Sequence, residues 1–246
     1  MKKTMLNTIS LDSVDSTNTY LRNLPPGDNE DWTLVTACYQ EAGRGAGRNR
    51  WESEAGKNLL FSLRTHPVFV EAPDVFVLSA SLALSVRHAL QNYIQGFSIK
   101  WPNDIYYGDR KIAGLLIENN LMGGRVQSCI MGVGINVNQM QFLSDAPNPV
   151  SLRQILGHEI PCSEVLQNFV GQFRSYYSRI QAHDYQALHD EFEGLLYRRN
   201  SSHAFRDANG TFTGRIAGVD PSGHLIITDA GGHTRRYAFK EVEYIL

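Results

Sequence analysis

Cysteine is scarce in this chain of 246 residues, which contains only Cys38, Cys129 and Cys162. An odd number of cysteines without a Cys-x-x-Cys pair argues against a disulfide-stapled scaffold and against a thiolate zinc site. We therefore expect no metal site built from this chain's side chains alone, and three neutral thiols in a reducing compartment.

Long apolar runs and a strong net charge are also missing. No stretch approaches the roughly 18 apolar residues that a membrane-spanning helix needs, and the N-terminus MKKTMLNTISLDSVDSTN lacks the apolar core of a signal peptide. The formal net charge is −2, so no global positive charge attracts nucleic acid or a membrane surface. These absences predict a cytoplasmic protein that binds neither nucleic acid nor membrane.

Positive charge is concentrated instead in one glycine-rich stretch, YQEAGRGAGRNRWES at residues 39–53. It lies between two predicted strands, TLVTACYQ and NLLFSLRT. Glycine lets backbone N–H groups approach a phosphate closely, and arginine supplies a planar, permanently charged fork. A Walker A loop and a Rossmann turn are excluded, because each needs a following helix. The stretch favours an anionic ligand, and a solvated surface loop is the alternative.

The first half of the chain alternates strand and helix patterns, which favours an α/β or α+β domain. A strand is predicted over TISLDSV, followed by a short helix that Asp15 and Ser16 cap and that two prolines end. Residues 73–94 begin with a proline and predict a long, largely buried helix.

The middle of the chain predicts more strands and then helices. The segment FSIKWPNDIYY reads as a strand broken at Pro102, and residues 110–138 predict a hairpin that turns at Gly123 and Gly124. Residues 150–195 predict helices.

The pattern changes near residue 197, where short strands alternate with turn pairs such as Asn209–Gly210, Ser222–Gly223 and Gly231–Gly232. This predicts two domains, a larger one over 1–196 and a small all-β one over 197–246. The chain before the first predicted strand is too short for a DNA-binding domain, so none is expected.

Three further motifs are ambiguous when taken singly. KWPND at 100–104 presents Lys100, Asn103 and Asp104 at a proline-fixed turn, where Asn and Asp are most often structural. Lys111 starts the strand RKIAGLLIE, a position that is usually solvated. In GVGIN at 132–136, two glycines weaken a strand and indicate close packing against its backbone, with a bulge as the alternative.

Taken in order, the motifs resemble one family closely, the biotin–protein ligases, also called biotin–[acetyl-CoA-carboxylase] ligases. The resembling stretches are DSTN at 15–18, QEAGRG at 40–45, KWPND, RKIAGLLIE at 110–118 and GVGINVN at 132–138. The closing FKEVEYIL resembles the end of the family's SH3-like C-terminal domain. The resemblance implies an α+β fold: a mixed-sheet catalytic domain of the class II synthetase and biotinyl-lipoyl ligase type, followed by a small SH3-like β-barrel.

The resemblance also implies the activity, which uses ATP, Mg²⁺ and biotin. The biotin carboxylate attacks the α-phosphate of ATP, giving biotinyl-5'-AMP and pyrophosphate. A lysine of the biotin carboxyl carrier protein of a biotin-dependent carboxylase then takes the biotin. The resemblance leaves open whether the enzyme is a monomer or a homodimer.

Residue roles follow from the matching motifs. Lys111 and Arg44 are expected to neutralise charge on the reacting carboxylate and phosphate, and Asp104 to orient the acceptor amine or remove its proton. The expected contacts to biotin and the adenylate are Ser16, Thr17, Asn18, Gln40, Gly43, Gly45, Arg48 or Arg50, Trp51, Asn58, Lys100, Asn103, Gly114, Gly132, Gly134 and Asn136.

One position departs from the family pattern. Ala46 stands where the resembling enzymes usually have arginine or glutamine after the second glycine. Either Arg48 reaches the same phosphate by another path, or the adenylate is retained less tightly, and we expect faster release of biotinyl-AMP.

Two other functions compete with this interpretation. A lipoate ligase or octanoyltransferase is implied to share the fold, but no triple glycine followed by histidine is present. A non-catalytic module that only binds biotin or an adenylate would make no pyrophosphate from biotin and ATP.

Overall fold

The central feature of the computed structural model, which describes residues 5–25, 32–47, 49–144 and 148–245, is a mixed sheet of seven strands. Its order is β1-β2-β3-β7-β6-β5-β4, and only β1 and β2 pair in parallel. The strands are β1 (Leu6–Val14), β2 (Trp32–Gln40), β3 (Leu59–Thr65), β4 (Phe97–Lys100), β5 (Asp104–Tyr107), β6 (Arg110–Met122) and β7 (Arg125–Ile135). The predicted α+β mixed-sheet fold is confirmed.

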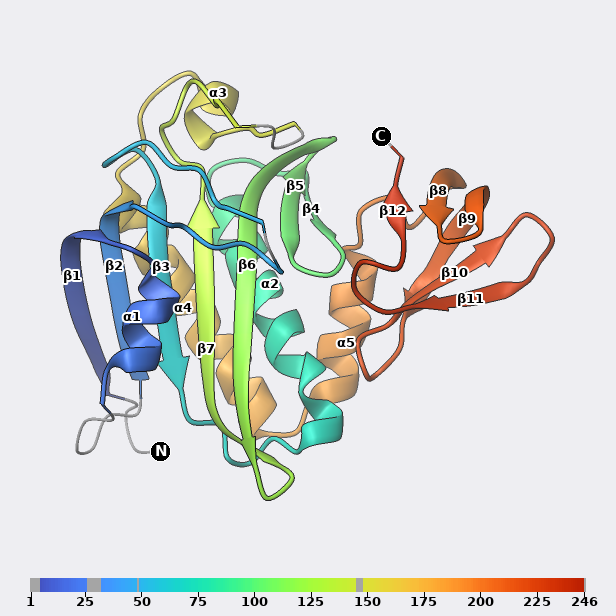
Figure 1. Ribbon diagram of the computed structural model, residues 1–246, viewed down its shortest axis with the longest axis horizontal. Coiled ribbons are helices and arrows are strands. Elements are labelled where there is room, and N and C mark those ends of the chain that lie inside the picture. Colours follow the sequence, from blue (N-terminus) through green and yellow to red (C-terminus); the bar gives the residue numbers. More distant parts are fainter. Residues whose placement is uncertain (1–4, 26–31, 48, 145–147, 246) are drawn as a thin grey trace.

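Helices cover both faces of this sheet (Figure 1). The short α1 (Thr17–Asn23) lies on one face, and α2 (Phe76–Gln91) and α4 (Cys162–Gln181) lie on the other, with α5 (Tyr185–Gly194) beside α2. A further short helix, α3, spans Leu152–Leu156. Because α1 and α4 contact opposite faces of β3, every residue of β3 is buried.

The helix starts differ from the sequence expectations. The helix predicted over 73–94 begins only at Phe76, because Pro73 lies in a separate 3-10 turn, Ala72–Asp74. Ser16 does stand at the N-cap of α1, but neither Ser16 nor Asp15 caps it with a side chain; the Asp15 carboxylate accepts a hydrogen bond from Ser16 N–H instead. The N–H of Thr17, the first helical residue, is satisfied by the distant Gln40 side chain at 2.8 Å.

Two hairpins, β4–β5 and β6–β7, form one side of the large sheet. The segment expected as one broken strand is two antiparallel strands, β4 and β5, in which Lys100 pairs with Asp104. The hairpin predicted over 110–138 is confirmed as β6 and β7, and Gly123 and Gly124 both adopt positive φ at its turn.

The C-terminal residues form a second, antiparallel sheet in the order β11-β10-β9-β8-β12 (Figure 1). Its strands are β8 (His203–Asp207), β9 (Gly210–Val219), β10 (Leu225–Asp229), β11 (Thr234–Tyr237) and β12 (Glu243–Tyr244). Trp101 Nε1 donates a hydrogen bond to the Gly223 carbonyl at 2.9 Å, and one apolar core includes residues of both sheets. The boundary at 196/197 and an SH3-like closure of this sheet stay predictions.

None of the described helices combines the length and the apolar character that crossing a membrane requires.

Candidate active site

A cavity of about 1000 Å³ opens between the large sheet, the loop that joins β2 to β3 and the segment that leads into β12. We call residues 41–58 the Arg/Gly loop. The residues expected at the ligand that line this cavity are Ser16, Thr17, Asn18, Gln40, Arg44, Gly45, Arg50, Trp51, Lys100, Asn103, Asp104, Lys111, Gly114, Gly132, Gly134 and Asn136. Residues of all five motifs, from DSTN at 15–18 to GVGINVN at 132–138, therefore line one cavity. The cavity is large enough for a nucleotide-sized ligand.

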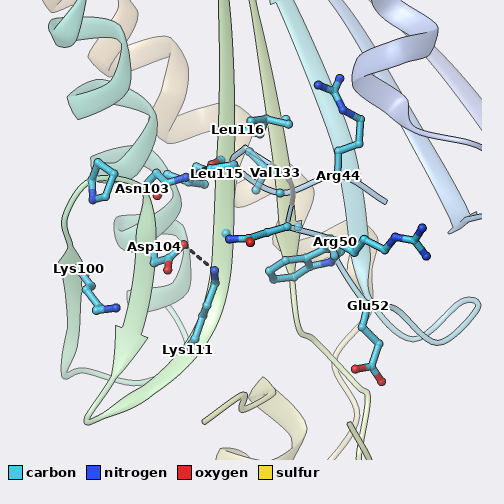
Figure 2. A pocket seen from close by; sticks show the side chains of 18 of the residues that line it. Arg44, Arg50, Glu52, Lys100, Asn103, Asp104, Lys111, Leu115, Leu116 and Val133 are labelled. Atoms are coloured by element: carbon cyan, nitrogen blue, oxygen red, sulfur yellow. Dashed lines mark hydrogen bonds and ion pairs between the residues drawn. The ribbon is translucent and has the colours of Figure 1, made fainter. Parts of the chain in front are cut away.

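An ion pair on β5 and β6 marks one wall of the cavity. Lys111 Nζ lies 2.7 Å from Asp104 Oδ1, and both side chains are mostly buried (Figure 2). The Lys111 ammonium also lies 5.6 Å from the centroid of the Trp51 ring. The pair combines a fixed positive charge with a carboxylate that can accept a proton or a hydrogen bond.

A second lysine stands beside this pair. Lys100 Nζ lies 5.1 Å from the centroid of the Tyr106 ring and 5.0 Å from that of Tyr244 in the C-terminal sheet. Burial lowers the pKa of the Lys100 ammonium, while the negative charge of Asp104 acts in the opposite direction. The cavity thus holds a lysine that is contacted mainly by aromatic faces rather than by a carboxylate.

A buried hydrogen-bond network forms the wall under α1. Gln40 Oε1 accepts hydrogen bonds from Thr17 N–H at 2.8 Å and from Thr17 Oγ1 at 3.1 Å. Ser62 Oγ, on β3, lies within hydrogen-bond distance of Thr17 Oγ1 at 2.7 Å and of Asn18 Oδ1. These polar groups are held in place from three elements, which suits a ligand with few hydrogen-bonding atoms.

The close packing expected at the strand glycines is present, but the protein's own side chains provide it. A Cβ on Gly132 would lie 2.2 Å from Asn18 Oδ1, and a Cβ on Gly134 would lie 2.4 Å from Trp51 Cε2. A Cβ on Gly114 would also meet Trp51, at 2.8 Å. The Trp51 Nε1 group is buried and has no hydrogen-bond partner. The indole therefore lies over β6 and β7, at the glycines that the family resemblance implied as ligand contacts.

The two described arginines of the Arg/Gly loop, Arg44 and Arg50, do not reach the Lys111–Asp104 pair. Arg44 Nη1 lies 3.2 Å from Glu118 Oε1 on β6, and Arg22 of α1 pairs with the same carboxylate. Burial alone would raise the pKa of Glu118, but hydrogen bonds from Asn18 and Arg22 and the nearby arginine charges lower it. Figure 2 shows Arg44 and Arg50 directed away from Lys111.

Two of the expected ligand contacts that the structure describes, Asn58 and Gly43, do not line this cavity. Asn58 is buried away from the cavity lining, where its Oδ1 accepts Val137 N–H at 3.1 Å, a structural role. Gly43 lines a smaller neighbouring hollow, and its carbonyl accepts Trp51 N–H at 2.9 Å. Arg48 lies outside the described residues. Their contacts to a ligand stay predictions.

Sequence reasoning missed several residues that shape the site. Tyr244 and Lys240, from the far end of the chain, line the cavity. Ser62 and Glu118 lie on strands and contact two of the lining residues, Asn18 and Arg44. The sequence signal for Glu118 was its place at the end of the motif RKIAGLLIE.

Comparison with known proteins gives a consistent result. Residues 10–136 match the model of the biotin/lipoate A/B protein ligase family. The "Bifunctional ligase/repressor BirA" of Bacillus spizizenii is 31% identical over 92% of this chain and 71% of its own length. The "Biotin--[acetyl-CoA-carboxylase] ligase" of Paracoccus denitrificans is 28% identical over 89% and 92% of the two chains.

Among solved structures, the biotin protein ligase from Aquifex aeolicus in complex with biotin and ATP superimposes with a TM-score of 0.81 at 26% identity. The match covers 97% of this chain and 99% of that one. The resemblance seen in the motifs therefore extends over both sheets. The chain belongs to the biotin/lipoate A/B protein ligase family.

Proposed function

We propose that this protein activates biotin with ATP to biotinyl-5'-AMP and transfers the biotin to a lysine of a biotin carboxyl carrier protein. The finer proposal is that the acceptor belongs to an acetyl-CoA carboxylase, as the name of the Paracoccus relative states for that protein. The observation that carries the proposal is the Lys111–Asp104 pair, 2.7 Å apart in the wall of the cavity. This pair supports the proposal because adenylate formation needs a cation and amine transfer needs a proton acceptor.

In the first half-reaction, an oxygen of the biotin carboxylate attacks the α-phosphorus, and pyrophosphate leaves with the electron pair of the broken P–O bond. The negative charge that gathers on the phosphate oxygens must be neutralised in place. Lys111 supplies a fixed positive charge for this purpose. Arg44 supplies another only after it exchanges its Glu118 partner for the phosphate.

In the second half-reaction, the acceptor amine attacks the mixed-anhydride carbonyl, and AMP leaves. The amine must lose its proton before or during the attack. Asp104 lies in the cavity wall, and its side chain is 19% exposed, so an entering ammonium can reach it. We assign Asp104 the role of orienting this amine and accepting its proton.

Magnesium fits this site only together with the nucleotide. Among the described residues, no group of three or more His, Cys, Asp or Glu side chains is placed to hold a metal ion. Mg²⁺ commonly binds through one or two carboxylates and the phosphate oxygens of a substrate. When bound with ATP it would supply further charge neutralisation.

The binding pocket for biotin is proposed at the hydrogen-bond network of Thr17, Gln40 and Ser62. Biotin combines an apolar body with a ureido group that both donates and accepts hydrogen bonds. The network offers hydroxyl and amide groups at fixed positions beside the backbone of Gly132. Trp51 must leave the backbone of Gly134 if the ligand is to lie against both strands.

The test measures both half-reactions with the purified chain. Mixing biotin with ATP and Mg²⁺ should release pyrophosphate, and adding a carrier domain should produce biotinylated carrier. Lipoate in place of biotin tests the other substrate class of the family and should give little turnover. Absence of pyrophosphate with biotin would overturn the proposal, and efficient turnover of lipoate would reassign the substrate.

A further inference from the structure

A lysine of the C-terminal sheet reaches the tip of the Arg/Gly loop. Lys240 lies between β11 and β12 and lines the main cavity. A Cβ placed on Gly47 would lie 2.2 Å from Lys240 Nζ and 3.0 Å from its Cε. The Arg/Gly loop and the segment between β11 and β12 therefore meet at the cavity. The Lys240 ammonium group lies directly over the backbone of Gly47.

The charge of Lys240 is not compensated within the described part of the chain. Arg44 and Lys111 each have a carboxylate partner, whereas Lys240 forms no ion pair with any described residue. The acidic side chains next to it are engaged elsewhere: Glu241 accepts Ala238 N–H at 2.7 Å, and Glu243 lies 3.7 Å from Arg206. The Lys240 ammonium is thus available to an anion.

The backbone at Lys240 is held in an uncommon conformation. Its φ is +70°, in the left-handed region that residues other than glycine seldom adopt. The turn is closed by Glu241 N–H donating to the Ala238 carbonyl at 3.1 Å. Such conformations persist where the surrounding structure fixes them, and they cluster at binding sites. Next to Gly47, Ala46 lines the cavity without a charge, and Lys240 brings a cation to this tip in addition to Arg44 and Arg50 nearby.

We propose that Lys240 binds the polyphosphate of ATP and compensates the charge of the pyrophosphate that leaves when the adenylate forms. The inference rests on the proposed function, since it assigns one residue of that site to the leaving group. A small, highly charged anion is favoured over an acidic surface of the carrier protein. The reason is that Lys240, although exposed, lines the same cavity as Arg44 and Lys111, where the phosphates of ATP are proposed to bind.

The first test compares Lys240→Met with Lys240→Arg in the pyrophosphate-release reaction, with ATP varied at saturating biotin. A lost charge-assisted hydrogen bond should raise the KM for ATP roughly tenfold in Lys240→Met. Lys240→Arg should recover most of this loss. The affinity for biotin, and biotin transfer from preformed biotinyl-AMP, should stay unchanged. The matched control is Lys57→Met, because Lys57 pairs with Glu159 at 3.6 Å and does not line the cavity.

The second test needs no turnover. Inorganic pyrophosphate is titrated by calorimetry into the wild type and Lys240→Met, and the variant should bind it roughly tenfold more weakly. Equal pyrophosphate affinities and equal KM values for ATP would overturn the inference. So would a defect confined to transfer to the carrier, or an equal loss of biotin affinity. A wild type that binds pyrophosphate through Lys240 but makes none from biotin would refute the proposed function alone.

Discussion

At the scale of the residue, two cationic side chains of the cavity are each paired with a carboxylate of the protein. Arg44 is paired with Glu118, and Lys111 is paired with Asp104. Under the proposed function, a phosphate would compete with Glu118 for Arg44, and an incoming amine would compete with Lys111 for Asp104. Replacing one partner should affect one half-reaction more than the other.

Replacing Asp104 by Asn should separate the two half-reactions. The amide keeps the shape of the side chain but cannot take a proton at neutral pH, so transfer to the carrier lysine should fall by about two orders of magnitude or more. Pyrophosphate release with biotin and ATP should fall much less, because Lys111 is still present. Quench-flow measurement of each step checks this. An equal loss in both steps would contradict the role assigned to Asp104.

Position 46 offers a gain-of-function test. Ala46 lines the cavity but carries no charge, and the sequence predicts that biotinyl-AMP escapes faster than from relatives with arginine there. Ala46→Arg should slow release of preformed biotinyl-AMP in a carrier-free assay by about tenfold. Ala46→Gln, which adds length without charge, is the control for bulk. An unchanged release rate in Ala46→Arg would refute this reason for weak retention.

At the scale of the element, the two long strands β6 and β7 depend on glycine where Trp51 covers them. Gly134 does not use a positive φ, so its small size is the property that matters. Gly134→Ala places a methyl group 2.4 Å from Trp51 Cε2 and must displace the indole. We expect a loss of about 1–3 kcal/mol in the free energy of unfolding and weaker adenylate binding.

A matched alanine substitution separates crowding from the loss of glycine itself. Gly171 lies inside α4, and an added Cβ would meet nothing within 4 Å. Gly171→Ala should stabilise the protein by up to about 1 kcal/mol, because alanine favours the helix. Chemical denaturation of both variants checks the pair. Equal effects in the two variants would show that Trp51 does not restrict Gly134.

The elements themselves were largely readable from the sequence. Period-two alternation predicted β1, and Gly123–Gly124 predicted the turn between β6 and β7. The start of α1 was misjudged in detail, because its first N–H is satisfied by Gln40, which is 23 residues away from Thr17. The motifs predicted Asp104 and Lys111 as site residues, but the ion pair between them was not predicted. The rings around Lys100 come partly from Tyr244 and needed the folded chain.

At the scale of the whole molecule, the C-terminal sheet is joined to the catalytic sheet rather than tethered beside it. Trp101 Nε1 donates to the Gly223 carbonyl, and a Cβ on Gly223 would lie 2.6 Å from Phe76 Cδ2 of α2. One apolar core includes residues of both sheets. We therefore expect a single cooperative unfolding transition.

Trp101→Phe tests this coupling. An aromatic ring is retained, but the partly buried Gly223 carbonyl loses its donor, which should cost about 1 kcal/mol of stability. The transition should stay single when followed both by far-ultraviolet circular dichroism and by tryptophan fluorescence. Two separate transitions in the wild type would contradict a shared core and would favour independent domains split near residue 196.

The most direct test of the proposed chemistry measures the transfer of labelled biotin to a carrier domain by the wild type and by Lys111→Ala. Lys111 lies next to Asp104, the carboxylate that we propose receives the acceptor amine. The wild type should label the carrier in the presence of ATP and Mg²⁺, and Lys111→Ala should label it at least about a hundredfold more slowly while remaining folded. Labelling at the wild-type rate by Lys111→Ala would contradict the assignment of this cavity as the catalytic site.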